Sequence, residues 1–369
     1  MSRTLLMPGD PAPWFRAASN VNPDFDFSSA AGRFIVLSFL GPTGSPAARA
    51  MHAAFVAQAS LFVTADRYFF GVALGPRDAS PFAELRPGMD MFWDDGRLCR
   101  RYGALPQEDG TDDFMPVTYL LGLDLRIIAV ARHGEPEAQV AFVLDALKRL
   151  PALGAERSGR PGAPVLYLPD VFEPELCRRL IDGYEAHGGV DSGFMREEGG
   201  KTVLVVDHKH KRRSDWHIAD EALCTLLRQR VLRRIVPEIH RAFQFKVTRM
   251  ERYLVACYDS AVGGYFQPHR DNTTKGTAHR RFAVTINLNT EDYEGGALMF
   301  PEYGRVSYRP STGGAVVFSC SLLHQAMPVT RGKRFAFLPF LYDDAAARQR
   351  EANNAFLGEN VAAYRADRS

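Results

Sequence analysis

The sequence predicts two domains, an α/β domain followed by a larger barrel of antiparallel β-strands. The chain has 369 residues, more than a single hydrophobic core usually accommodates. Residues 151–162 are rich in proline, glycine and charge and lack hydrophobic periodicity, which is typical of a linker. Strands alternate with helices before this segment, and short strands dominate after it. We therefore expect domains over residues 1–150 and 163–345, and a helical tail over 346–369.

The N-terminal part begins with a strongly apolar strand and continues as alternating elements. A Gly- and Pro-rich turn over 41–46 follows the first strand and precedes an Ala-rich helix that ends near Gln58. The remaining pattern predicts strands and one closing helix. The expected strands are 34–39, 69–72 and 117–121, and the expected closing helix is 136–149.

The C-terminal part begins with a strand and two helices, which we expect to support the barrel. The second helix has an apolar stripe at helical spacing, typical of core packing rather than of a cofactor site. Short strands separated by turn residues then predict a jelly-roll, or double-stranded β-helix. The expected helices are 175–184 and 220–243, with the stripe Leu223, Leu226, Val231, Ile235 and Ile239; the expected strands are 164–168, 254–258, 282–288, 297–300, 305–308, 315–318 and 333–338.

Three side chains in the strand-rich part have the pattern of a metal site. His269 and Asp271 lie at or near the end of a strand, where residues two apart project to the same face. His324 comes from a distant strand. Two histidines and one carboxylate on one side of an ion are typical of non-haem Fe(II) oxygenases, because other coordination positions stay open. A lone His-x-Asp pair also occurs by chance, so the hypothesis depends on the further residues around it.

Arg334 and Tyr258 supply that further support. An iron site of this kind needs a co-substrate that donates electrons, and a 2-oxo acid both chelates the metal and presents a distant carboxylate. Arginine grips a carboxylate with two parallel hydrogen bonds, and Arg334 follows His324 closely on a strand. Tyr258 is placed to donate a phenol hydrogen bond to the same group. The alternatives are an ordinary ion pair for Arg334 and a core aromatic for Tyr258.

The order of these motifs resembles the 2-oxoglutarate-dependent prolyl hydroxylases, including their oxygen-sensing branch, over residues 162–345. The motifs are 256–258, 263–265, 269–272, 287–289, 295–298, His324 with 328–329, and Arg334. The resemblance implies that Fe(II) is bound by His269, Asp271 and His324, that Arg334 and Tyr258 hold 2-oxoglutarate, and that O2 is consumed, with ascorbate as an optional cofactor.

Two positions refine that resemblance. The chain has Ile286 where the oxygen-sensing branch often has a second co-substrate tyrosine, so Thr285 or Asn287 is expected to substitute. Related halogenases replace the metal-binding carboxylate with a small residue, whereas Asp271 is present here. Hydroxylation is therefore favoured over halogenation.

The N-terminal part resembles the peroxiredoxin branch of the thioredoxin fold over residues 5–149. Pro116 matches the cis-proline of that family, but Thr43, Gly44 and Ser45 stand where the reactive cysteine belongs. Cys99 lies elsewhere and is expected to be a structural thiol. Because a hydroxyl cannot replace a thiolate in peroxide reduction, we expect a redox-inactive module that serves partner binding, substrate presentation or homodimerisation.

A basic segment over residues 207–214 contains His208 and His210 and a run of lysine and arginine up to Arg213. One interpretation is a solvated loop, which we favour; another is part of a lid over the substrate, in contact with an acidic group or a phosphate. His217 and His279 receive no role.

Composition limits the class of protein. The net charge of +2 gives no reason to expect nucleic acid or an anionic membrane as a partner. No apolar run is long enough to span a bilayer, and the N-terminus lacks a signal-peptide core, which together predict a soluble cytoplasmic protein. The five cysteines have no paired spacing and are expected to be reduced.

The function we predict is hydroxylation of a C–H bond, with a prolyl residue of a peptide or protein as the leading substrate and a free amino acid or small metabolite next. A second hypothesis is nucleic-acid demethylation, prompted by the basic segment, although no broadly basic surface supports it. A third is a non-catalytic metal- or ligand-binding scaffold whose N-terminal domain recruits a partner.

Overall fold

The structure is a computed structural model that describes residues 3–75, 82, 86–107, 113–132, 135–154 and 162–366. The chain forms two compact units, Met1–Arg157 and Ser158–Ser369, and each is described by itself. Most of the predicted linker, residues 155–161, lies outside the described residues. Within the described ranges, no helix combines the length and apolar character that crossing a lipid bilayer requires.

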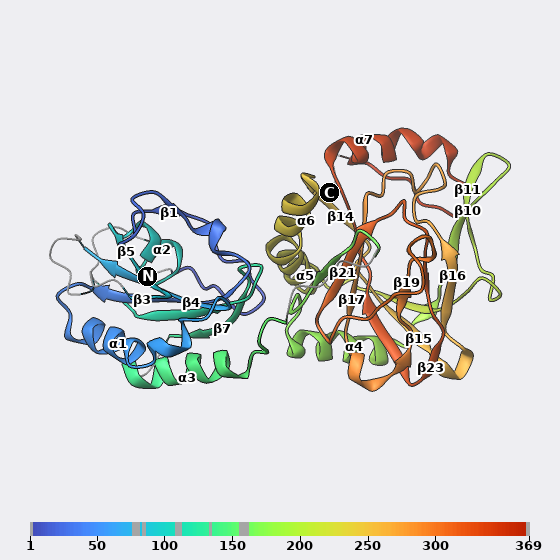
Figure 1. Ribbon diagram of the computed structural model, residues 1–369. Coiled ribbons are helices and arrows are strands. Elements are labelled where there is room, and N and C mark those ends of the chain that lie inside the picture. The colour runs from blue at the N-terminus through green and yellow to red at the C-terminus, as the bar shows by residue number, and fades with distance from the viewer. Residues whose placement is uncertain are drawn as a thin grey trace. The chain divides into compact units, whose positions relative to one another are not determined.

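The N-terminal unit is built on a five-stranded sheet with the order β5-β4-β3-β6-β7 (Figure 1). The central strand β3 pairs in parallel with β4 and antiparallel with β6. Nearly every residue of β3 is buried, because helices and loops cover both faces of the sheet. This mixed order is that of a thioredoxin-like fold. The strands are β3 (Phe34–Pro42), β4 (Arg67–Leu74), β5 (Met89–Asp94), β6 (Val117–Leu121) and β7 (Ile127–Ala131), and β1 (Arg16–Ala17) pairs with β2 (Phe25–Asp26) beside them.

Two helices, α1 (Pro46–Val56) and α3 (Pro136–Arg149), pack together on one face of that sheet. The short α2 (Arg97–Arg101) contributes Leu98 and Cys99 to the core of the opposite face. Burial, together with nearby Asp94, raises the pKa of the Cys99 thiol. Cys99 therefore has the environment of a structural thiol, as expected from the sequence.

Residues 43–45, which stand where a peroxiredoxin has its reactive cysteine, have a structural role here. The Ser45 hydroxyl accepts a hydrogen bond from the backbone N–H of Ala48 and caps α1. Thr43 is buried just before it. The sequence left the isomer of the peptide bond before Pro116 open, and the described residues contain no cis peptide bond.

The C-terminal unit contains two facing antiparallel sheets, the arrangement of a jelly-roll (Figure 1). The larger sheet has the order β14-β25-β17-β24-β15-β13-β9; β21 also pairs with β17, and β8 pairs with β21. Its strands are β8 (Leu166–Leu168), β9 (Val190–Asp191), β13 (Ser214–His217), β14 (Arg249–Glu251), β15 (Leu254–Asp259), β17 (Phe282–Asn287), β21 (Ala315–Ser319), β24 (Lys333–Phe337) and β25 (Phe340–Tyr342). Its outer face packs on helices, which bury the largest apolar cluster of the unit.

The smaller sheet has the order β12-β16-β22-β19-β20. Its strands are β12 (Lys211–Arg212), β16 (Tyr265–His269), β19 (Leu298–Met299), β20 (Ser307–Tyr308) and β22 (His324–Ala326). Two further pairs, β10 (Phe194–Glu198) with β11 (Lys201–Val205) and β18 (Glu294–Gly295) with β23 (Val329–Arg331), complete the strands of the unit.

The helices of this unit differ from the prediction at two places. The predicted helix over 220–243 is two helices, α5 (Glu221–Arg234) and α6 (Val236–Phe243), because Pro237 near the start of α6 cannot continue the hydrogen bonds of α5. The predicted helical tail begins with α7 (Asp344–Ala352) and a 3-10 turn, η7 (Asn353–Phe356), but residues 357–365 after them are not helical. The first predicted helix is α4 (Pro174–His187).

Candidate active site

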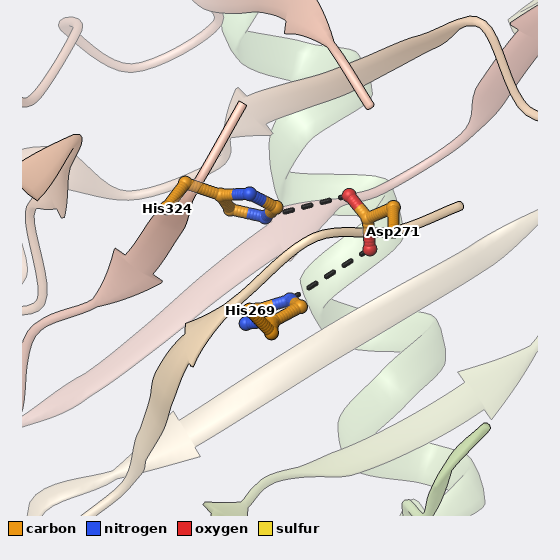
Figure 2. Close-up of side chains that lie close together, drawn as sticks. All are labelled: His269, Asp271 and His324. Atoms are coloured by element: carbon orange, nitrogen blue, oxygen red, sulfur yellow. Dashed lines mark ion pairs between the residues drawn. The ribbon is translucent and has the colours of Figure 1, made fainter. Parts of the chain in front are cut away.

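The three predicted metal ligands lie together at the end of the smaller sheet (Figure 2). His269 on β16 and His324 on β22 are direct partners across the two antiparallel strands. Asp271 follows β16 by two residues, and its backbone N–H donates to the carbonyl of Cys320 at 3.0 Å. One ligand atom from each of the three side chains lies within 4.8 Å of the others. Strand pairing therefore produces the proximity of residues that are far apart in sequence.

The imidazoles are oriented by backbone carbonyls. Nδ1 of His269 donates to the carbonyl of Gln267 at 2.7 Å, and Nδ1 of His324 donates to that of Leu322 at 3.0 Å. A carbonyl can only accept, so each Nδ1 bears the proton and each Nε2 keeps a free lone pair. These Nε2 atoms lie 3.7 and 3.4 Å from the two carboxylate oxygens of Asp271.

The surroundings of His269 and Asp271 shift the pKa values of both side chains toward the forms that bind a metal. Burial, reinforced by His324, lowers the pKa of His269 to about 3, so this imidazole is neutral at physiological pH. Burial alone would raise the pKa of Asp271, but the two histidines hold it below its usual value. Two imidazole nitrogens and one carboxylate form a donor set that fits Fe(II) and leaves further coordination positions available.

Arg334 and Tyr258 face each other on adjacent strands, β24 and β15. The Arg334 guanidinium is 5.1 Å from the centre of the Tyr258 ring, and both side chains are almost fully buried. Nε and Nη2 of Arg334 donate to Oδ1 of Asn287 at 3.4 and 3.3 Å, and no carboxylate in the described part of the chain forms an ion pair with Arg334. A buried guanidinium without an acidic partner is suited to bind the carboxylate of a ligand.

Thr285 and Asn287, the two residues expected to substitute for the second co-substrate tyrosine, lie in different environments. Thr285 lines the cavity that contains the metal ligands. Asn287 does not line that cavity; its amide donates to the carbonyl of Pro310, and its oxygen accepts from Arg334. Thr285 is therefore placed to contact a ligand, whereas Asn287 positions Arg334. Ile286 points to the opposite side of the sheet and is fully buried in the main core.

One cavity of about 1000 Å³ joins these groups. Its walls include the three metal-ligand candidates together with Arg334 and Tyr258. This volume is at the upper end for small-molecule sites, so it can hold a co-substrate and part of a second molecule. Residues of the β10–β11 hairpin and Val361 and Ala362 of the C-terminal tail also line it. The tail is fixed to the hairpin by backbone hydrogen bonds such as Gly358 N–H to Thr202 at 2.9 Å.

The favoured interpretation of the basic segment as a solvated loop is wrong for Lys211 and Arg213. Residues 211–212 form β12, which pairs with the metal-ligand strand β16. Lys211 and Arg213 are buried and line the cavity, while His208, Lys209 and Arg212 are exposed. Alternation along an extended chain places residues 211 and 213 inside and residue 212 outside. His210 packs against the rings of Phe194 and Phe266.

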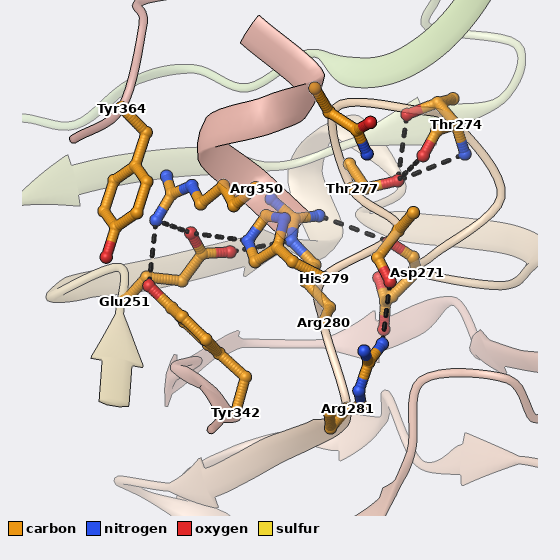
Figure 3. Close-up of polar contacts among 12 residues, drawn as sticks. Glu251, Asp271, Thr274, Thr277, His279, Arg280, Arg281, Tyr342, Arg350 and Tyr364 are labelled. Atoms are coloured by element: carbon orange, nitrogen blue, oxygen red, sulfur yellow. Dashed lines mark hydrogen bonds and ion pairs between the residues drawn. The ribbon is translucent and has the colours of Figure 1, made fainter. Parts of the chain in front are cut away.

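A buried ion cluster supports the loop that bears Asp271 (Figure 3). Glu251 is 8% exposed and accepts hydrogen bonds from Arg280 at 2.8 Å and His279 at 3.2 Å; Nη1 of Arg350, on α7, lies 2.7 Å from its carboxylate. Arg280 also donates to the backbone carbonyl of Asp271 at 3.4 Å. His279 had no predicted role and Glu251 was not predicted as part of the site, because only the fold brings these side chains together.

Fold and site together define a jelly-roll of the non-haem iron oxygenase class. Residues 253–342 match the sequence model of the 2OG-Fe(II) oxygenase superfamily. The C-terminal unit is therefore a 2OG-Fe(II) oxygenase domain, and the chain is a hydroxylating dioxygenase that uses Fe(II), 2-oxoglutarate and O2.

Curated relatives align with this part of the chain. A PKHD-type hydroxylase from Shewanella sp. (strain ANA-3) is 25% identical over 183 residues, which cover 48% of this chain and 77% of the relative. A PKHD-type hydroxylase from Maricaulis maris (strain MCS10) is 34% identical over 90 residues, covering 24% of this chain and 40% of the relative.

Solved structures resemble each unit separately. A prolyl hydroxylase from Trichoplax adhaerens, in complex with a hypoxia inducible factor peptide fragment, has a TM-score of 0.41 and 18% identity, covering 51% of this chain and 86% of that one. The peroxidoxin BcpB from Mycobacterium tuberculosis has a TM-score of 0.37 and 18% identity, covering 40% of this chain and 100% of that one. The strand order of each unit, rather than these similarities, defines its fold.

Proposed function

We propose that this dioxygenase hydroxylates a prolyl residue of a peptide or protein, with His269, Asp271 and His324 as the iron ligands. The observation that supports the ligand assignment most strongly is the convergence of two free Nε2 atoms and a carboxylate on one point of an accessible cavity. The prolyl substrate rests on the order of motifs that resembles the prolyl hydroxylases. A free amino acid or small metabolite is the next substrate class.

The remaining residues would bind and orient the co-substrate, 2-oxoglutarate. Arg334 would hold the distal carboxylate of 2-oxoglutarate through its guanidinium, and Tyr258 would donate a hydrogen bond to the same carboxylate. Thr285 would contact the co-substrate, and Asn287 would keep Arg334 in place. Bound Fe(II), with 2-oxoglutarate and O2, would supply the oxidant that inserts one oxygen atom into a C–H bond as 2-oxoglutarate is converted to succinate and CO2. The apolar rings around the histidines, Phe266 and Phe318, would keep water away from the reacting groups.

The test is 2-oxoglutarate-dependent succinate release by the full chain with Fe(II), together with mass analysis of candidate prolyl peptides for a gain of one oxygen. His269→Ala should abolish both signals. Lys209→Met, which changes an exposed cation near the cavity, should leave both unchanged. Succinate release without any oxidised peptide would leave the dioxygenase intact and exclude the tested peptides as substrates.

The two other hypotheses make different predictions. A non-catalytic scaffold would release no succinate, whether or not it binds a metal. Nucleic-acid demethylation would require the basic segment to face a polymer, yet Lys211 and Arg213 are buried inside the cavity. We also propose that the thioredoxin-like unit lacks redox activity and serves partner binding, substrate presentation or homodimerisation. A cytoplasmic location and a requirement for ascorbate remain predictions from the sequence.

A further inference from the structure

Lys211 is a buried cation that lacks an acidic partner. Lys211 is 3% exposed. Its Nζ donates hydrogen bonds to the hydroxyl of Ser192 at 2.7 Å and to the backbone carbonyl of Gly193 at 2.6 Å. Both acceptors are neutral, and among the described residues no carboxylate comes within ion-pair distance of it. Lysine is almost never fully buried unless it is paired, and burial lowers the pKa of Lys211 well below its ordinary value. An anion that enters the cavity would favour the charged form of this side chain, so the site is suited to receive one.

Two arginines extend the positive charge around Lys211. Arg213 donates to Asp215 at 2.6 Å, and Arg252 lies 3.6 Å from the same carboxylate oxygen. Asp215 is thus the single carboxylate shared by these arginines, and Nε of Arg213 is buried without a hydrogen-bond acceptor. We name Lys211, Arg213 and Arg252 the cation cluster. All three line the cavity. Their positive charges outnumber the single negative charge of Asp215, the carboxylate that pairs with the two arginines.

The backbone at Arg252 indicates that the position of this side chain matters. Its φ of 68° lies in the left-handed region, which a long L side chain rarely adopts. Such conformations persist only where the surrounding structure enforces them, and they concentrate at functional sites. Arg252 follows β14 directly, next to Glu251, and both residues line the cavity.

The cation cluster lies beside the metal ligands and borders the co-substrate site, because Nη1 of Arg213 donates to the hydroxyl of Tyr258 at 3.5 Å. Lys211 and Arg252 have other partners. The Lys211 ammonium is 5.1 Å from the centre of the Phe266 ring, and that ring stacks on His269 with 3.5 Å between centres. In the proposed function, Arg334 neutralises the distal carboxylate of 2-oxoglutarate and the metal neutralises the proximal one. The excess charge of the cation cluster therefore remains for the second molecule.

We propose that the substrate carries an anionic group, a carboxylate or a phosphate, that binds the cation cluster and so fixes the C–H bond that faces the metal. This inference rests on the proposed function, because it names the substrate class of the same cavity. A chain terminus, an acidic side chain or a small anionic metabolite could present such a group. A neutral internal prolyl segment could not.

Ligand-observed NMR on the metal-free full chain tests this binding without requiring turnover. The probes are N-acetyl-L-proline, its neutral amide N-acetyl-L-prolinamide, and inorganic phosphate. We expect N-acetyl-L-proline or phosphate to bind at least about tenfold more tightly than the amide, a difference of about 1.4 kcal/mol. The stronger of the two anions identifies carboxylate or phosphate as the group recognised. Equal binding of the acid and the amide with no binding of phosphate, or no binding by any probe, would overturn the proposal.

Variants assign the binding to the cation cluster. Lys211→Met and Arg252→Gln should each weaken anion binding about tenfold, whereas Lys209→Met should not change it. Arg334→Gln should preserve it; loss in Arg334→Gln with retention in Lys211→Met would show that the anion occupies the co-substrate site instead and would refute the inference. Thermal melting identifies any variant that fails to fold. If Lys211→Met or Arg252→Gln fails, anion binding by the other variant tests the assignment. Anion binding by a chain that releases no succinate would refute the proposed function and would leave the cation cluster only as an anion-binding site.

Discussion

Replacing Glu251 with glutamine should destabilise the C-terminal unit strongly. The carboxylate is almost completely buried and lies against Arg280, His279 and Arg350. Glutamine keeps the volume but removes the charge, so two arginines lose their only shared anion. Removing one partner of a buried ion pair costs about 3–5 kcal/mol. For a domain of this size, each kcal/mol lowers Tm by about 2–4 °C, which gives an expected decrease of about 6–20 °C.

Differential scanning calorimetry of the full chain measures this change in Tm. The matched control is Glu294→Gln, which removes the carboxylate of an exposed pair with Arg331 at 2.8 Å. Exposed pairs contribute little, so Tm should change by less than about 4 °C. A Glu251→Gln protein that melts within that same range would refute the view that the ion cluster holds the loop of Asp271 in place.

Three further predictions concern the co-substrate, pH and redox chemistry. Asn287→Ala should raise the KM for 2-oxoglutarate about fivefold with a smaller effect on kcat, because it removes about 1 kcal/mol of support for Arg334; steady-state succinate release checks this, and an unchanged KM would contradict it. The pKa of Glu251 is held below its ordinary value of 4.5. Its stabilising effect is therefore present above about pH 4.5 and is lost as the pH falls further, so the difference in Tm between wild type and Glu251→Gln should shrink below that pH; a constant difference would be inconsistent with this pKa. The protein should show no thiol-dependent peroxide consumption, and Cys99→Ser should alter nothing in that assay; measurable consumption that this variant abolishes would contradict the structural role of Cys99.

Much of the site could be predicted because the types of residue found at the ends of strands indicate its chemistry. His269, Asp271 and His324 belong to a donor set with few alternative uses, and apolar strand patterns around them indicated the barrel. The structure adds the reason for their proximity, which is the direct pairing of β16 with β22. The helix α3 was equally accessible to prediction, because its apolar spacing and its first-turn proline mark both the helix and its start.

Other features could not be predicted because they depend on tertiary contacts. Glu251 and Arg350 are distant in sequence and meet only when α7 folds back onto the barrel. The burial of Lys211 and Arg213 contradicts the usual behaviour of a basic run, although their alternation with Arg212 was a signal that the segment is a strand. Pro237 was a second missed signal, since proline marks the break between α5 and α6.

The most direct test of the central claim is an anaerobic titration of the metal-free protein with Fe(II) in the presence of 2-oxoglutarate, followed by the visible charge-transfer absorption that arises when a 2-oxo acid chelates ferrous iron. The account predicts one iron per chain in the wild type and no such absorption in His324→Ala. An undiminished signal in His324→Ala, or no signal in a folded wild-type protein, would contradict the assignment of the three side chains as ligands of a single iron.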